Sequence, residues 1–130
     1  MGIGNEEDAS AAPVIKNGKV AGNYLGEEIE RNAVPGQTPI PGYDDGFDRT
    51  SPAGSFAGDR FGLYDLGGNV FEWCQDLDDP AGPEKRVLRG GSWGNFMELE
   101  LRSSRRVSYR PSYRYGVGGF RLVLEAGSGG

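Results

Sequence analysis

One stretch, residues 61–73 (FGLYDLGGNVFEW), constrains the fold of this chain more than any other. The adjacent glycines Gly67-Gly68 can adopt positive φ and therefore predict a sharp reversal of the chain. The residues that follow, 70–73, have the composition of a β-strand. Asp65 and Glu72 stand on either side of the reversal, and a buried carboxylate is costly unless it is paired or bound to a cation. The stretch is thus compatible with carboxylates that bind turn amides and with carboxylates that bind a metal ion.

Composition limits the classes of protein to consider. The chain has 130 residues, which predicts one domain, and its 23 Gly, 8 Pro and 36% hydrophobic residues predict many turns and loops. A net charge of −5 argues against a nucleic-acid partner. Without His the chain lacks imidazole bases, and its single Cys excludes an internal disulfide. No long apolar run and no signal-peptide pattern is visible, so we expect no membrane span, and the compartment stays open.

Along the chain we expect an extended N-terminal arm at 1–20, one domain at 21–125 and a flexible tail at 126–130. A Pro/Gly-rich loop at 35–42 excludes regular structure there. The predicted regular elements are short: a helix at 25–31, strands at 70–73 and 86–88, a strand or extended segment at 98–102, and a buried closing strand at 120–124.

Three blocks in order carry a resemblance to a known family. They are residues 61–73, residues 86–93 (RVLRGGSW) and residues 119–123 (GFRLV). Together they resemble the formylglycine-generating-enzyme (sulfatase-modifying-factor) family, a branch of the C-type lectin fold, over roughly residues 20–124. The resemblance implies an α+β, loop-rich domain of C-type lectin fold, formylglycine-generating-enzyme-like, with a small twisted antiparallel sheet. The core expected for it comprises Phe61, Leu63, Tyr64, Val70, Trp73, Val87, Trp93, Phe120 and Leu122.

Domains of this family usually carry a further segment before the point at which this chain begins. That segment includes the strand that pairs with the closing strand. The chain therefore fits a minimal version of the domain, a fragment, or a domain whose 120–124 strand pairs with the N-terminal arm or with another chain.

Calcium is the cofactor that the acidic residues favour. Ca²⁺ binds six to eight oxygens and mixes carboxylates with backbone carbonyls. By resemblance, one site would use the Asn23 and Asp45 side chains with the Tyr24 and Phe47 carbonyls. A second would use the Asp65 and Glu72 side chains with the Gly68 and Val70 carbonyls. The alternative for all four side chains is ordinary capping of turns.

Catalysis is not expected. By resemblance, the active enzymes oxidise a substrate cysteine with two copper-binding thiols that lie between the GGSW and GFR blocks. Here residues 93–118 contain no Cys, the second thiol position falls on Ser103 and the first falls near Glu98. A serine hydroxyl is a poor ligand for copper, so no copper is expected. Cys74 follows the wrong block and is predicted to pack as a small apolar residue.

Residues 94–117 are the candidate ligand surface. Tyr, Ser, Gly and Arg dominate there, as they do in antibody paratopes. We expect at least two of Tyr109, Tyr113 and Tyr115 to be exposed on one face with Phe96 beside them, because the segment offers few aliphatic partners. The alternative is a solvated arginine-rich loop with tyrosines over arginine stems.

A narrower resemblance concerns the variable proteins of diversity-generating retroelements. Their last block has the frame GGSW, Arg, Pro-x-x-Arg, GFR, which residues 90–93, Arg106, 111–114 and 119–121 reproduce. Randomising the adenines of asparagine codons cannot give Lys, Glu, Gln, Met or Trp, and the candidate variable positions contain none of these. Those positions, which are also the predicted ligand-binding residues, are Gly94, Asn95, Phe96, Val107, Ser108, Tyr109, Arg110, Ser112, Tyr113, Tyr115, Gly116 and Val117.

The sequence therefore predicts a non-catalytic module that presents a variable surface to a protein or other macromolecular ligand. The alternatives are a degenerate or partial sulfatase-modifying enzyme domain and a purely structural accessory domain.

Overall fold

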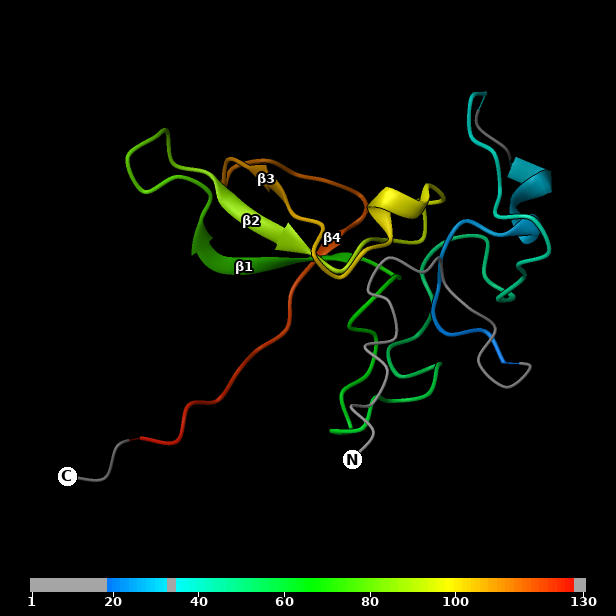
Figure 1. Ribbon diagram of the computed structural model, residues 1–130, viewed down its shortest axis with the longest axis horizontal. Helices are drawn as coiled ribbons and strands as arrows, with labels where there is room; N and C mark the ends of the chain where they lie inside the picture. Colours follow the sequence, from blue (N-terminus) through cyan, green and yellow to red (C-terminus); the bar gives the residue numbers. More distant parts are fainter. Residues whose placement is uncertain (1–18, 33–34, 128–130) are drawn as a thin grey trace, which may run out of the picture.

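A computed structural model describes residues 19–32 and 35–127 (Figure 1). Most of the predicted arm at 1–20 and the end of the predicted tail, residues 128–130, lie outside the described part. The regular elements are few and short: the 3-10 helix η1 (Glu27–Asn32), β1 (Phe71–Leu77), β2 (Arg86–Arg89), the 3-10 helix η2 (Glu98–Glu100), β3 (Val107–Tyr109) and β4 (Gly118–Gly119).

The strands form one mixed sheet in the order β3-β2-β1-β4. The pairs β1/β2 and β2/β3 are antiparallel, as expected, but β4 runs parallel to β1 through Phe71↔Gly118 and Glu72↔Gly119. The predicted small antiparallel sheet is thus present as a mixed sheet, with one parallel edge. An irregular register between Trp73 and Leu77 bends β1, which is visibly curved in Figure 1.

The strands predicted at 70–73 and 86–88 are confirmed as β1 and β2, since their side chains suit a half-buried pleated surface. The helix predicted at 25–31 is confirmed as a helical segment of 3-10 type. Residues 35–42 form turns and irregular backbone, as their Pro and Gly content predicts.

Two predicted strands are wrong. The alternating residues at 98–102 contain η2, which the Met97 amide caps by donating to the Glu100 carboxylate at 3.4 Å. The predicted buried strand at 120–124 is neither buried nor paired, since β4 ends at Gly119. Phe120 is 74% exposed and Leu124 is 96% exposed. Figure 1 shows this C-terminal segment leaving the sheet and extending away from the rest of the molecule.

The core differs from the predicted one. Five predicted members, Phe61, Leu63, Tyr64, Phe120 and Leu122, are exposed; Val70, Trp73 and Trp93 are half-buried, and Val87 is buried. The Asp59 carboxylate accepts hydrogen bonds from the amides of Phe61 and Leu63, and these turns leave the apolar side chains outside. The buried apolar residues are Tyr24, Leu25, Ile29, Tyr43, Phe71, Val87 and Leu88.

Tyr43 holds the loops of residues 19–70 together. Its hydroxyl donates to the Gly22 carbonyl and accepts from the Gly22 amide at 3.3 Å, and its ring meets Tyr24 edge-on at 6.3 Å. Burial raises its pKa, so the hydroxyl remains protonated and keeps this role at neutral pH. This region, which contains little regular secondary structure, thus packs around a buried aromatic ring whose hydroxyl is hydrogen-bonded.

The predicted reversal at Gly67-Gly68 is confirmed and joins these loops to the sheet. Gly68 has φ of 83°, and a Cβ at this position would lie 2.5 Å from the Asn23 carbonyl oxygen. The Gly68 amide donates to the Gly90 carbonyl at 2.7 Å, and the Asn69 amide donates to the Asn23 carbonyl at 2.8 Å. Only glycine fits there, because any side chain would meet backbone.

Candidate functional site: an anchored loop region and an exposed tyrosine cluster

The structure brings together the residues of the first predicted calcium site. Asp45 lies in a turn whose Phe47 amide donates to Asp45 Oδ1 at 3.0 Å, and the Tyr24 amide donates to Asp45 Oδ2 at 2.8 Å. Asn23 is fully buried beside Tyr24 and donates from Nδ2 to the Arg49 carbonyl at 2.6 Å. The Asn23–Tyr24 and Asp45–Phe47 segments, which are distant in sequence, therefore meet in one place.

Two buried side-chain oxygens in the region of Asn23, Glu28 and Asp45 lack hydrogen-bond partners. Asn23 Oδ1 and Glu28 Oε2 are buried and accept no hydrogen bond within the described part of the chain. The pKa of Asp45 is raised to about 6, chiefly by burial and also by the nearby Glu28 and Asp44 carboxylates, while the two amides oppose the shift. Both Asp45 oxygens accept backbone amides, as the turn-capping alternative expects, whereas the two unpartnered oxygens are acceptors of the kind that calcium binds. The sequence prediction did not include Glu28, whose place in a helix two residues after a glycine carries no such signal.

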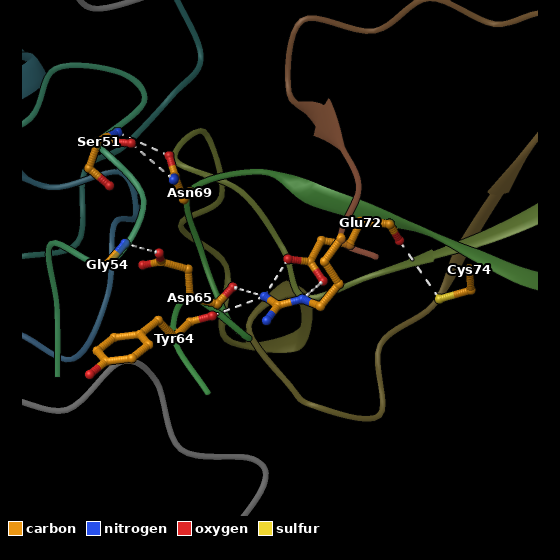
Figure 2. A network of polar contacts seen from close by, with 8 residues as sticks. Ser51, Gly54, Tyr64, Asp65, Asn69, Glu72 and Cys74 are labelled. Atoms are coloured by element: carbon orange, nitrogen blue, oxygen red, sulfur yellow. Dashed lines mark hydrogen bonds and ion pairs between the residues drawn. The ribbon is translucent and has the colours of Figure 1, made fainter. Parts of the chain in front are cut away.

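The second predicted calcium site is arranged differently. Glu72 on β1 is paired with Arg121, whose Nε and Nη2 donate to the two carboxylate oxygens at 2.6 and 2.5 Å. Asp65 points away, and its carboxylate accepts the Gly54 amide at 2.6 Å (Figure 2). The Glu72 oxygens thus already hold a guanidinium, and the two carboxylates of this predicted site are engaged with different partners.

Arg121 also binds the chain on the other side of the reversal. Its Nη2 donates to the Tyr64 and Asp65 carbonyls at 3.0 and 3.1 Å, and the hydrogen bonds to Glu72 raise its pKa. One side chain therefore ties the start of the C-terminal segment to β1 and to residues 64–65. The dashed lines that end on the labelled Tyr64, Asp65 and Glu72 in Figure 2 mark these contacts.

Across all described residues, no three His, Cys, Asp or Glu side chains gather in a manner that could hold a metal. Any cation at the Asn23–Asp45 place would therefore rely on the amide oxygen and on backbone carbonyls as well as on the carboxylate. Calcium accepts such a ligand set, whereas zinc and copper prefer nitrogen and sulfur.

Three tyrosines form a cluster on the outer strand of the sheet and in the two turns that follow it. The Tyr109 and Tyr113 rings are stacked, with centroids 4.6 Å apart and planes 12° apart, and Tyr115 lies 5.7 and 5.6 Å from them. Tyr113 is 44% exposed and Tyr115 is 39% exposed, so the prediction that at least two of the rings are exposed is confirmed. We call Tyr109, Tyr113 and Tyr115 the tyrosine cluster.

Local hydrogen bonds position the cluster. The Tyr113 amide donates to the Arg110 carbonyl at 2.9 Å, and the Gly118 amide donates to the Tyr115 carbonyl at 3.0 Å, so two successive turns carry the rings. Asp78, in the loop after β1, holds the strand that precedes them. It accepts from Ser108 Oγ at 2.7 Å and forms an ion pair with Arg106 at 3.0 Å.

The other predicted ligand positions differ in exposure. The prediction that Asn95 belongs to the ligand surface is wrong, because Asn95 is buried. Its Oδ1 accepts from the Ser92 amide at 2.8 Å and from Ser92 Oγ at 3.0 Å. Its carbonyl also accepts from the Leu25 amide at 3.1 Å, so Asn95 fastens the loop and does not face a ligand. The exposed positions are Arg110, Ser112, Tyr113, Tyr115 and Gly116; the half-buried ones are Gly94, Phe96, Val107, Ser108, Tyr109 and Val117.

Ser103, at the expected position of a catalytic thiol, lines a pocket of about 990 Å³. Cys74 lines the same pocket and is half-buried, and burial raises the pKa of its thiol. A raised pKa keeps the sulfur protonated, whereas a nucleophilic or copper-binding cysteine needs a thiolate. Glu98, near the other thiol position, does not belong to the lining of this pocket. The pocket thus holds one unactivated thiol, and at the expected thiol position it has the Ser103 hydroxyl.

The family model for the sulfatase-modifying factor enzyme 1-like domain matches residues 7–126. The chain belongs to this family. It is 39% identical over 89 residues to the inactive C-alpha-formylglycine-generating enzyme 2 of Mus musculus, an alignment that covers 65% of this chain and 29% of that protein. It is also 34% identical over 99 residues to the formylglycine-generating enzyme of Streptomyces coelicolor. That alignment covers 64% of this chain and 32% of that protein.

A solved structure, Treponema denticola variable protein 1, has the same fold with a TM-score of 0.51 and 32% identity. The alignment covers 55% of this chain and 31% of that one. The chain thus spans under a third of the length of each of these three relatives. Both the family and the fold that the three sequence blocks predict are confirmed. No helix in the described part of the chain is long and apolar enough to cross a membrane.

Proposed function

We propose that this chain is a non-catalytic binding module that presents the surface of residues 94–117, without the buried Asn95, to a protein or other macromolecular ligand. The tyrosine cluster is the observation that carries the proposal. Its rings pack on one another, two of them are substantially exposed, and strand β3 and the two hydrogen-bonded turns after it hold them. Rigid tyrosines that are already ordered contribute contact area at low entropic cost, as they do in paratopes.

The lack of a thiol pair between the GGSW and GFR blocks supports a non-catalytic role. Residues 93–118 contain no Cys, and Ser103 stands where the resemblance places a thiol. Similarity to a relative that is named inactive points the same way, although an active enzyme is also similar. A titration with Cu(I) separates the two readings: we expect no stoichiometric binding, and tight binding of copper would favour the enzyme.

The binding proposal is tested with peptides selected from a random phage-displayed library on the immobilised chain. Replacing all three cluster tyrosines with Ala should reduce the affinity for the selected peptides by a factor that corresponds to about 2 kcal/mol or more. The free energy of unfolding should fall by only about 1 kcal/mol, because two of the rings are largely solvated. Unfolding of the triple variant, or peptides that still bind it, would contradict the proposal.

Similarity to a variable protein supports a finer proposal, that a retroelement diversifies this surface. The sequence of the neighbouring DNA tests it. A reverse transcriptase gene and a near-repeat of codons 90–121 that differs at template adenines are expected, and their absence from the locus would contradict it.

We propose further that a calcium ion binds at the place formed by Asn23, Asp45 and the carbonyls of Tyr24 and Phe47. Support comes from the unpartnered Asn23 Oδ1 and from the desolvated Asp45 carboxylate. Such an ion would stabilise the loops and lie apart from the tyrosine cluster. The resemblance also suggested calcium at Asp65 and Glu72, but the ion pair between Glu72 and Arg121 speaks against that ligand set.

A further inference from the structure

The charge of the chain is divided unevenly around the tyrosine cluster. Residues 101–121 contain six of the 14 basic residues, all of them arginines, and none of the 19 acidic residues. This stretch therefore carries a charge of +6, and the rest of the chain carries −11, which together give the net charge of −5. An acidic protein thus presents one concentrated positive segment, and the cluster lies within it.

Half of these arginines are neutralised locally. The pairs are Arg102 with Glu98 at 3.8 Å, Arg106 with Asp78 at 3.0 Å and Arg121 with Glu72 at 2.5 Å. Arg105, Arg110 and Arg114 are exposed and form no ion pair with any residue of the described ranges. Their charges are free to act on a molecule that approaches the surface.

Two of the free arginines belong to the turns that carry the rings. Arg110 begins the turn that Tyr113 closes, and the Arg114 guanidinium donates to the Pro111 carbonyl of the same turn at 3.3 Å. Burial raises the pKa of Tyr115, so its hydroxyl remains a proton donor. Residues 110–115 therefore offer guanidinium and phenol donors within one short exposed segment, and a carboxylate accepts from both.

We propose that the ligand of this surface is a polypeptide whose contacting segment is acidic, with carboxylates that bind Arg110 and Arg114 while the tyrosine cluster packs against the same segment. This inference rests on the proposed binding function and names the chemistry of its partner. Charge complementarity of this kind raises the association rate and selects among partners.

A nucleic acid is the competing polyanion, and two observations disfavour it. The faces of Tyr109 and Tyr113 are stacked on each other at 4.6 Å, so they leave no gap into which a base could insert between them. The charge of −11 on the rest of the chain repels a long polyanion that extends beyond the small positive segment. A short acidic run on a protein meets the arginines without that penalty.

The test uses the full chain, the peptides selected from the random library, and a charge-reversed double variant, Arg110→Glu/Arg114→Glu. The matched control is Arg60→Glu/Lys85→Glu, which changes the net charge equally outside residues 101–121. We expect the selected peptides to be net negative. Their affinity should fall by about tenfold or more on the double variant, remain close to that of wild type on the control, and decrease with added salt.

Selected peptides that are neutral or basic, or that bind the double variant as well as they bind wild type, overturn the inference, as does a library that yields no binder. If such peptides still fail to bind the triple tyrosine variant, the proposed binding function survives and only the acidic partner is wrong. A mixed-sequence single-stranded DNA that binds more tightly than the best peptide, and that loses affinity on the double variant, would also overturn the inference and assign the surface to nucleic acid.

Discussion

The loops of residues 19–70 and the outer segment of residues 107–117 both contain little regular structure, yet Tyr43 in the first and Tyr113 in the second are placed in opposite ways. Tyr43 is 2% exposed and both donates and accepts hydrogen bonds through its hydroxyl, whereas Tyr113 is 44% exposed and contacts mainly other tyrosine rings. The first region buries Tyr24 and Tyr43 and packs them against each other, although its Tyr64 is exposed. The second leaves Tyr113 and Tyr115 exposed to solvent.

This difference teaches how a domain with little regular structure can separate stability from recognition. Substitutions in the exposed turns alter few buried contacts, because Asp78 and backbone hydrogen bonds position the segment. Substitutions among the buried loops should affect the whole fold. Four experiments test where the boundary lies.

The largest effect is expected for Tyr43→Ala. Removing a buried aromatic ring should lower the free energy of unfolding by about 3–5 kcal/mol, as measured by chemical denaturation. Tyr43→Phe is the matched control: it keeps the ring and leaves the Gly22 amide and carbonyl without their partner, at a cost of about 1–3 kcal/mol. A loss below about 1 kcal/mol for the Ala variant would show that these loops are not the stable part.

Removal of calcium should give the next effect. An ion bound only by the folded chain adds about 2.7 kcal/mol at a hundredfold excess over its Kd, so a chelator should lower the melting temperature. Asp45→Asn or Asn23→Ala should abolish this response, while the exposed Asp44→Asn, whose carboxylate accepts the Gly46 amide of its own turn, should keep it. A wild-type melting temperature that ignores the chelator rules out the proposed ion.

Arg121→Ala tests whether the stable region includes the start of the C-terminal segment. The change leaves Glu72 without its cation and removes the donor to the Tyr64 and Asp65 carbonyls. Because both side chains are partly exposed, we expect a loss of about 1–2 kcal/mol in the free energy of unfolding. The exposed Arg114→Ala is the control and should cost less than about 0.5 kcal/mol. Equal losses for both variants would remove the special role of Arg121.

The smallest effect is expected for Tyr113→Ala, with a change in the free energy of unfolding of about 0.5 kcal/mol. Its ring is the more exposed member of the stacked pair, so little apolar area returns to water. Chemical denaturation beside Tyr43→Ala makes the comparison direct. A loss above about 2 kcal/mol would place the cluster in the core and erase the contrast between the two regions.

Local sequence predicted the elements that depend on local chemistry. The reversal at Gly68 follows from a backbone that admits no side chain, and β1 follows from four strand-forming residues. The exposure of the tyrosine cluster followed from the lack of aliphatic neighbours within its own segment. These predictions needed no knowledge of distant contacts.

The failures concern pairing and burial, which depend on distant residues. The apolar residues 120–124 read as a core strand, yet only Gly118 and Gly119 find a partner on β1. Phe61 read as core, but the turn around Asp59 leaves it outside. Asn95 read as a variable contact, and only the fold reveals the Ser92 hydroxyl and Leu25 amide that bind it. Alternation over the five residues 98–102 was too short to separate a strand from a 3-10 turn.

The two-residue length of β4 has a mechanical consequence. A force that pulls on the C-terminal segment acts on the edge strand β4. Two residue pairs, Phe71↔Gly118 and Glu72↔Gly119, join this strand to β1. Arg121 stands just ahead of those pairs and is held by a carboxylate and two carbonyls on the other side of the reversal. Tension on residues 122–127 therefore loads the contacts of the Arg121 guanidinium first. These contacts must break before the force can separate β4 from β1.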